Sequence, residues 1–173
     1  KDDTEIGALK KRAKNGDADA QFKLAHMYEN GEGITRDLRE AVESYRKAAE
    51  QGRAQAQHNL GWMYIEGSGD LTKNLSEAAK WLHKSAKQGH KSSQNSLGYM
   101  YQAGKGVPQD YETVVKWYRL GAEQGYAPAQ SNLGVMYDNG RGVPQDYKTA
   151  VKWYTLAAEQ GNVHAQNYLG WMY

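Results

Sequence analysis

Three kinds of residue in this chain could do chemistry: paired glycines ahead of helix-like segments, histidines near glutamates, and isolated aromatic residues. The stretches GKGVPQDYETVVKWY, from Gly104, and GRGVPQDYKTAVKWY, from Gly140, are nearly identical and stand 36 residues apart. A glycine-rich loop that leads into a helix can hold a phosphate group, because its backbone N–H groups point at the anion. The same glycines would also suit a sharp turn between two helices.

A metal site would need ligands such as His26 and His58, completed by Glu29 or Glu66. The sequence contains no His-Glu-x-x-His spacing, and the lack of cysteine excludes a zinc–thiolate site. It also contains no Gly-x-Ser-x-Gly motif of the kind that exposes a nucleophilic serine. We therefore expect no metal, no cofactor and no catalytic residue.

The surrounding pattern is a tandem repeat. Ala-Gln or Ser-Gln, followed by Leu and then Met-Tyr, recurs in steps of 36, 37, 36 and 36 residues, and Gln-Gly closes successive units. The repeated glutamines are Gln21, Gln57, Gln94, Gln130 and Gln166. Because a Gly-x-Gly pair stands at the same place in four units and never continues into Gly-Lys-Ser/Thr, the pattern favours a turn over a phosphate loop.

Each unit reads as two amphipathic helices. Ala129, Leu133 and Met136 form one apolar stripe, and Ala150 and Trp153 belong to the next. Short polar residues that can cap the second helices are Asp37, Asn74, Asp110 and Asp146. Glycines inside the first helices cost about 1 kcal/mol each relative to alanine, so they predict close helix–helix approach. They are Gly61, Gly98, Gly134 and Gly170.

The repeat boundaries predict a single all-helical domain, 1–173. It consists of an N-terminal capping helix at 1–16, repeats at 17–53, 54–90, 91–126 and 127–162, and a partial repeat at 163–173. The partial repeat lacks a second helix to cover it, and solenoids need polar caps at their ends. We therefore expect the natural array to continue, and we regard this uncapped end as a candidate surface for self-association.

The repeated pattern resembles the Sel1-like repeat family, which is related to the tetratricopeptide repeats. The resemblance covers about residues 17–173 and rests on Ala-x-Ala-Gln-x-x-Leu-Gly-x-Met-Tyr, Gly-x-Gly-Val, Asp and Ala-x-x-Trp-Tyr-x-x-Ala-Ala-x-Gln-Gly. It implies an all-α fold, a right-handed α/α superhelical solenoid of about 36-residue helix-turn-helix repeats. It also implies a non-enzymatic scaffold or adaptor that binds a peptide or protein segment in a concave groove. The alternative is a hydrolase acting on β-lactam-like or peptidoglycan-related substrates, as proposed for cysteine-rich relatives.

If the first helices line the concave side, as the resemblance implies, the exposed positions lie two before and one, five and eight after each repeated glutamine. These positions vary between units, whereas the core stripe does not. The protein-binding residues predicted from them are Phe22, His26, His58, Trp62, Asn95, Tyr99, Ser131, Val135 and Trp171. Large aromatic rings bordered by amides suit a peptide groove. The alternative for Trp62 and Tyr99 is that they cover neighbouring repeats.

Other aromatic residues and histidines have simpler interpretations. Trp81, Trp117 and Trp153 recur with the core stripe and are predicted to be structural. His83 and His90 are expected on the solvated surface.

Composition limits the partners. The 22 Lys and Arg residues against 20 Asp and Glu give a net charge of +2, and no groove position is basic, so we expect no nucleic-acid partner. No apolar run approaches the roughly 20 residues that a membrane span requires, so we expect no membrane insertion. The compartment stays open. We favour a soluble, bacterial periplasmic or secreted location over a cytoplasmic one.

Overall fold

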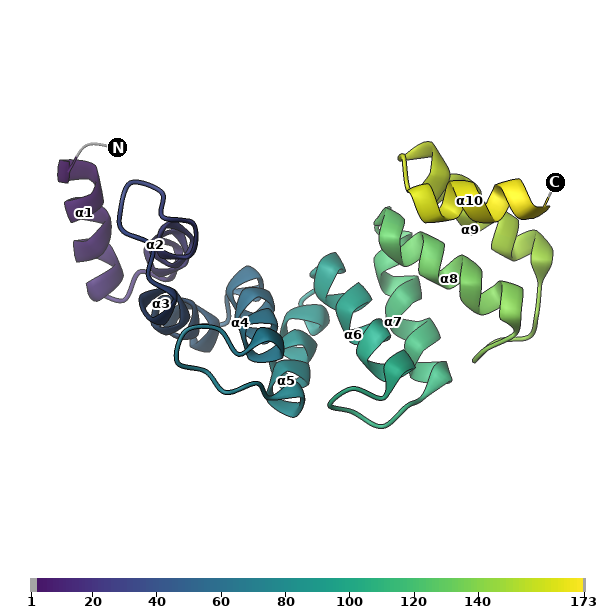
Figure 1. The fold of residues 1–173 in the computed structure, drawn as a ribbon, viewed down its shortest axis with the longest axis horizontal. Coiled ribbons are helices and arrows are strands. Elements are labelled where there is room, and N and C mark those ends of the chain that lie inside the picture. Colours follow the sequence, from purple (N-terminus) through teal and green to yellow (C-terminus); the bar gives the residue numbers. More distant parts are fainter. Residues whose placement is uncertain (1–2, 173) are drawn as a thin grey trace. The chain divides into compact units, whose positions relative to one another are not determined.

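The computed structural model describes residues 3–172 of the chain. These residues form ten helices and no strand, which confirms the predicted all-α fold (Figure 1). The helices are α1 Asp3–Lys14, α2 Ala18–Asn30, α3 Leu38–Glu50, α4 Ala54–Glu66, α5 Leu75–Lys87, α6 Lys91–Ala103, α7 Tyr111–Glu123, α8 Ala127–Asn139, α9 Tyr147–Glu159 and α10 Val163–Met172.

The chain divides into two compact units, Lys1–Ser85 and Ala86–Tyr173, and the division falls near the end of α5. In the first unit, α2 packs against α3 and α3 against α4. In the second unit, α6 packs against α7, α7 against α8, and α8 against α9, which also contacts α10. The pairs α2–α3, α6–α7 and α8–α9 therefore form hairpins, one in each of the predicted repeats 17–53, 91–126 and 127–162. The contacts between α3 and α4 and between α7 and α8 pack successive repeats on each other.

The second helices begin at the predicted caps. The carboxylates of Asp37, Asp110 and Asp146 each accept hydrogen bonds from two backbone N–H groups of the following turn. Asn74 accepts one from the backbone N–H of Glu77 at 3.0 Å. These caps satisfy N–H groups that have no partner within the helix.

The Gly-x-Gly pairs are turns, as predicted. The first glycine of each pair follows a first helix in the left-handed conformation, for example Gly140 at φ 62°. The second glycine permits close packing, because a Cβ at Gly142 would collide with the carbonyl oxygen of Tyr111. Gly69 similarly lies against the carbonyl of Leu38. The recurrence of the pair therefore follows from chain reversal and from contact with the preceding repeat.

The glycines inside the first helices mostly lie beneath a side chain of the second helix. A Cβ at Gly134 would lie 2.6 Å from ring carbons of Tyr154, and Gly98 has the same relation to Tyr118. The predicted close approach is thus confirmed there, and also at Gly61. Gly170 belongs to the partial repeat, which has no second helix within the chain, and an added Cβ there would have nothing within 4 Å.

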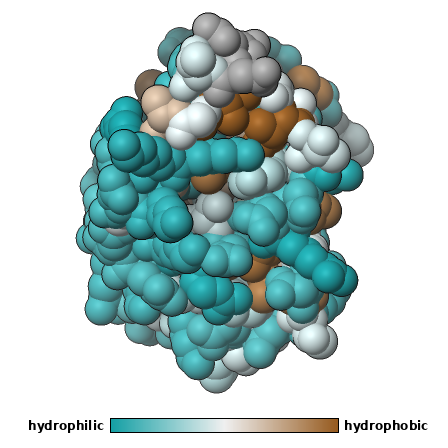
Figure 2. All heavy atoms as spheres, turned by 90° about the vertical axis from the view of Figure 1, so that its left-hand side faces the viewer, coloured by the Kyte–Doolittle hydropathy of each residue, from teal (hydrophilic) through white to brown (hydrophobic). Residues whose placement is uncertain are grey.

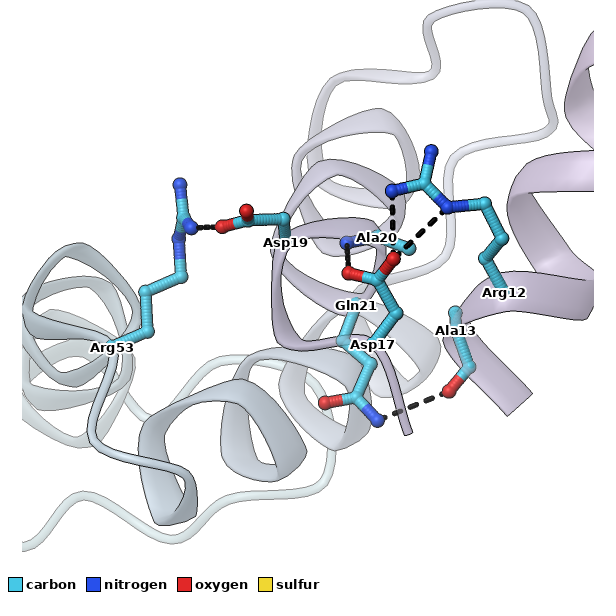
Figure 3. A network of polar contacts seen from close by, with 7 residues as sticks. All are labelled: Arg12, Ala13, Asp17, Asp19, Ala20, Gln21 and Arg53. Atoms are coloured by element: carbon cyan, nitrogen blue, oxygen red, sulfur yellow. Dashed lines mark hydrogen bonds and ion pairs between the residues drawn. The ribbon is translucent and has the colours of Figure 1, made fainter. Parts of the chain in front are cut away.

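The repeated glutamines form a hydrogen-bond ladder. Gln21 donates from Nε2 to the carbonyl oxygen of Ala13 at 3.0 Å (Figure 3), and its Oε1 accepts from Gln51 Nε2 at 2.7 Å. Gln94 and Gln130 make the equivalent two bonds with their own neighbours. All three side chains are buried. Each buried amide therefore joins its own helix to the end of the helix before it and to the residue that closes the helix after it.

The core contains the tryptophans that were predicted to be structural. Trp81 is buried in a cluster with Leu60 and Met63. Trp153 packs, half-buried, against a cluster that includes Val114 and Leu133. Trp117 is half-buried as well.

The surface on the side of α1 is mostly hydrophilic, with hydrophobic groups confined to small patches (Figure 2). On α1 itself, Ile6 and Ala13 are buried while Lys10, Lys11 and Lys14 are exposed. The capping role of residues 1–16 stays a prediction.

Candidate functional site

The first unit contains a pocket between α2 and α4, which we call the Trp62 pocket. Its volume is about 400 Å³, and it is lined by His26, Glu29, Asn30, Asn59, Trp62, Met63 and Glu66. His26 and Trp62 occupy equivalent positions, five residues after the repeated glutamines of successive repeats. Two of the nine predicted binding residues therefore line the same pocket. The side chain of Trp62 stays accessible, because the residue is 42% exposed.

A buried tyrosine fixes one wall of this pocket. The hydroxyl of Tyr45, from α3, donates to Glu29 Oε2 at 2.6 Å and also bonds the side chain of Asn59. Burial, followed by the hydrogen bond to Glu29, raises the pKa of Tyr45 well above its ordinary value. The phenol therefore stays a neutral donor, and it holds the Glu29 carboxylate at the edge of the pocket.

Phe22 does not line the pocket. Its ring is half-buried, with its centroid 5.7 Å from that of Tyr45. The guanidinium of Arg53 lies 4.4 Å from the Phe22 centroid and pairs with Asp19 (Figure 3). The ring is thus covered within its own unit, although the sequence predicted an exposed contact residue.

His58 and His26 both contact neighbours around the pocket. The His58 ring meets Trp62 edge-on at 6.5 Å between centroids, with 66° between the planes. His26 Nδ1 lies 3.8 Å from Glu32 Oε1. These contacts help to set the orientation of the two residues that stand five positions after the repeated glutamines.

In the second unit, the predicted residues occupy different surroundings. Tyr99 is 51% exposed, and the ammonium of Lys105 lies 5.1 Å from its ring centroid and 3.1 Å from its hydroxyl. Asn95 Oδ1 accepts from Asn132 Nδ2 at 2.9 Å. Val135 is half-buried against the core of the last repeat.

Ser131 corrects the expectation of an exposed side chain, because it is only 4% exposed. Phe22 and His58 occupy the same position in other repeats and are half-buried. A serine side chain is too short to reach out of this packed helix surface, so exposure here depends on side-chain length as well as on register.

A second pocket, of about 790 Å³, lies in the second unit among α8, α9 and α10. Its lining residues are Asp138, Tyr147, Val151, His164, Asn167, Tyr168 and Trp171. Trp171 was predicted, and it is 91% exposed. Tyr147 and Tyr168 were not predicted. Tyr147 repeats Tyr111 at the start of a second helix, and this recurrence could have identified it.

His90 is also not the solvated residue that was expected. It is half-buried, and its Nδ1 accepts from the backbone N–H of Ser93 at 3.3 Å, which caps α6. Burial, and then the charge of Lys91, lower the pKa of this imidazole. A histidine can thus serve as an N-cap at a position where the residues of two other repeats, Arg53 and Tyr126, form no side-chain cap.

Within residues 3–172, no group of three or more His, Cys, Asp or Glu side chains could hold a metal ion. No described helix has both the length and the apolar character needed to cross a bilayer.

Comparisons with known proteins identify related chains. A family model described as "Sel1 repeat" matches residues 18–52, 54–90, 91–126 and 127–162. The protein c5321 is a protective antigen present in uropathogenic Escherichia coli strains, and its sequence is 42% identical to this chain. Its crystal structure displays an SLR fold. It superposes with a TM-score of 0.93 over 96% of this chain and 36% of that one.

Two further relatives are a solved structure and a curated protein. A Sel1 repeat protein from Oxalobacter formigenes is 39% identical, with a TM-score of 0.85 over 92% of this chain and 63% of that one. "DAP3-binding cell death enhancer 1" of Rattus norvegicus is 41% identical over 58 residues, which are 33% of this chain and 11% of that protein. This chain thus spans less than two thirds of the length of each of these relatives.

The family model matches four consecutive segments of the chain, as expected for a tandem repeat. The helical hairpins likewise match solved structures of the SLR fold along almost the whole chain. The chain therefore belongs to the Sel1 repeat family, whose α/α solenoids commonly act as scaffolds for protein interactions and are typically not enzymes.

Proposed function

We propose that this chain is a non-enzymatic scaffold or adaptor that binds a peptide or protein segment, with the Trp62 pocket as one contact site. The observation that carries the proposal is the exposed indole of Trp62 beside a pocket lined by two asparagines. Large aromatic side chains supply much of the binding energy at protein interfaces.

The polar lining complements this apolar contact. Asn30 and Asn59 offer amide groups to the pocket, and an amide can pair with both N–H and C=O groups of an extended backbone. Asn30 also donates to the carbonyl oxygen of His26 at 3.0 Å, which holds its side chain in place. A bound segment would thus meet one aromatic anchor and several oriented polar groups.

The comparisons supply independent support. The Sel1 repeat family is commonly used for protein interaction. The name of the rat relative states a binding activity, "DAP3-binding", for the protein that shares 58 aligned residues with this chain. By analogy, we extend binding, and not that particular partner, to the present chain.

The proposal is tested by affinity capture with Trp62→Ala, followed by reconstitution with the purified partner. Leu120→Ala is the matched control, because Leu120 is also an exposed apolar residue at 45% but lies on α7 of the second unit and does not line the pocket. We expect Trp62→Ala to weaken binding by at least about tenfold, as for an interface anchor, while Leu120→Ala does not. Equal binding by both variants, at unchanged helicity, would discredit the Trp62 pocket.

The absence of catalysis is tested separately. We expect no turnover of nitrocefin, a chromogenic β-lactam, above the rate in buffer. Turnover that disappears on mutation of a pocket residue such as Glu29 would replace the scaffold by the hydrolase alternative.

We also propose self-association through the pocket among α8, α9 and α10, which we call the Trp171 pocket. Trp171 projects there at 91% exposure, beside the exposed rings of Tyr147 and Tyr168. A second copy could cover this apolar surface with its own Trp171 in a symmetric contact.

A further inference from the structure

We propose that the Trp62 pocket takes a cationic side chain, an arginine or lysine of the partner segment. This inference rests on the proposed function, and it names the chemistry that the pocket would select. It follows from comparing equivalent positions between repeats and from the charges that line the pocket.

The turn after a first helix can bring two positions of the repeat close together. They are the residue eleven positions after the repeated glutamine and the residue five positions after it, called here the eleventh and fifth positions. In the first repeat, Glu32 at the eleventh position approaches His26 at the fifth, with 3.8 Å between Oε1 and Nδ1. In the third repeat, the ammonium of Lys105 lies 5.1 Å from the ring centroid of Tyr99. The chain itself thus places a cation beside the aromatic residue at the fifth position, where the ammonium also lies 3.1 Å from the tyrosine hydroxyl.

The second repeat has the aromatic ring without the cation. Its fifth position is Trp62 and its eleventh is Ser68, whose hydroxyl donates to Glu66 Oε2 at 3.2 Å instead. Indole is the aromatic ring that attracts cations most strongly. Among the described residues, no Lys or Arg lies over the Trp62 ring, so its exposed surface is available to a cation from a partner.

The charges around the pocket have the sign that such a ligand needs. Glu29 and Glu66 line the pocket, and neither Lys nor Arg is among its described lining residues. Arg36 donates only to the backbone carbonyl of Glu29, at 2.9 Å. The hydrogen bond from Tyr45 occupies one oxygen of Glu29 and leaves the other able to accept from a guanidinium or ammonium group.

The third repeat provides the contrast. The position equivalent to Glu66 is Ala103 there, so the site beside Tyr99 has no carboxylate at that position. Its ring already contacts Lys105. Carboxylates thus lie beside the Trp62 ring, which has no cation from the chain itself. This combination is expected of a site that binds a cation from a partner.

The experiment uses the full chain and a small probe, N-acetylarginine methylamide, with the citrulline analogue as a neutral control of the same shape. The indole N–H signal of Trp62, assigned with Trp62→Phe, is followed by NMR during titration. We expect saturable shifts with the arginine probe at a Kd on the order of millimolar, as suits a single side chain. Citrulline should cause no saturable shift, and added salt should weaken the arginine response.

Two variants test the assigned chemistry. Glu66→Gln should weaken binding of the arginine probe by roughly threefold, as for a partly exposed ion pair. Ser68→Lys copies Lys105 into the second repeat and should weaken binding by roughly fivefold, because the new ammonium competes for the indole face. Lys105→Ser, in the site beside Tyr99, is the control and should leave the Trp62 response unchanged.

The outcomes separate this inference from the proposed function. Equal shifts with arginine and citrulline, or no shift of the Trp62 signal, would overturn the cation site. If Trp62→Ala still abolishes partner binding in that case, the scaffold proposal stands. Conversely, if arginine binds at Trp62 but Trp62→Ala leaves partner binding unchanged, the cation site is supported and the proposed contact with the partner is rejected.

Discussion

At the scale of single residues, the buried glutamines and the glycines beneath tyrosines determine how closely neighbouring helices approach. Gln130 donates to the carbonyl of Ala122 and accepts from the side-chain N–H of Gln160. Gly134 leaves room for the ring of Tyr154. Each feature depends on the identity of one residue, so each can be tested by a single substitution.

Gln130→Leu should destabilise the chain by about 2 kcal/mol, because it removes two hydrogen bonds of about 1 kcal/mol each, one to the carbonyl of Ala122 and one from Gln160. Gln160→Ala removes the exposed partner of the same bond and should cost less than about 1 kcal/mol. Urea unfolding followed by circular dichroism measures both. A Gln130→Leu protein as stable as the parent would show that the ladder contributes nothing to stability.

Gly134→Ala should lower the free energy of unfolding by about 1 kcal/mol or more, since the new methyl group would overlap the Tyr154 ring. The cost of this steric overlap should exceed the gain of about 1 kcal/mol in helix stability that alanine has over glycine. Gly170→Ala is the matched control, because no atom lies within 4 Å of the new Cβ. It should be neutral or slightly stabilising in the same unfolding assay. Equal effects of the two substitutions would contradict the packing explanation.

At the scale of helices, the sequence predicted most of the fold. Local signals such as Asp110 before α7 and Gly140 after α8 have a short-range cause, so they can be recognised in one chain. The partner of the buried Gln130 could not be predicted in this way, because it depends on how separate helices pack. The cap at His90 was missed because histidine seldom serves as an N-cap, so its side chain was assigned to solvent.

The cap at His90 should make α6 sensitive to pH. The pKa of His90 in the folded protein lies below its ordinary 6.5, since burial disfavours the charged ring. The unfolded chain therefore binds the proton first as the pH falls. The stabilisation is complete above about pH 6.5 and is lost as the pH falls through the lower, folded-state pKa. Protonation also removes the lone pair that accepts from Ser93.

His90→Asn keeps a capping acceptor that does not titrate. Urea unfolding at about pH 7.5 and about pH 5 should show a smaller loss of stability for this variant than for the parent chain. The other histidines are common to both proteins, so the difference reports on His90. Identical losses in the two proteins would rule out the proposed dependence.

At the scale of the whole molecule, the predicted binding residues differ in how far their side chains are exposed. Register identified positions that can face outward, and Trp62 and Tyr99 are exposed accordingly. It could not show that Arg53 covers Phe22, or that Ser131 is too short to emerge, because both depend on neighbouring side chains. The Trp62 pocket in the first unit and the Trp171 pocket in the second are therefore the surfaces on which interaction should be tested.

Self-association through Trp171 is tested by sedimentation equilibrium over a range of protein concentrations. The parent chain should show an average mass that rises above that of the monomer, because pairing would remove an exposed indole and the apolar rings around it from water. Trp171→Asp should abolish the rise, since a symmetric contact would bring two carboxylates together. Leu120→Asp changes another exposed apolar residue on a different helix and should leave the rise intact. A parent chain that stays monomeric at every concentration, or a Trp171→Asp variant that associates like the parent, would exclude this surface as a contact between copies.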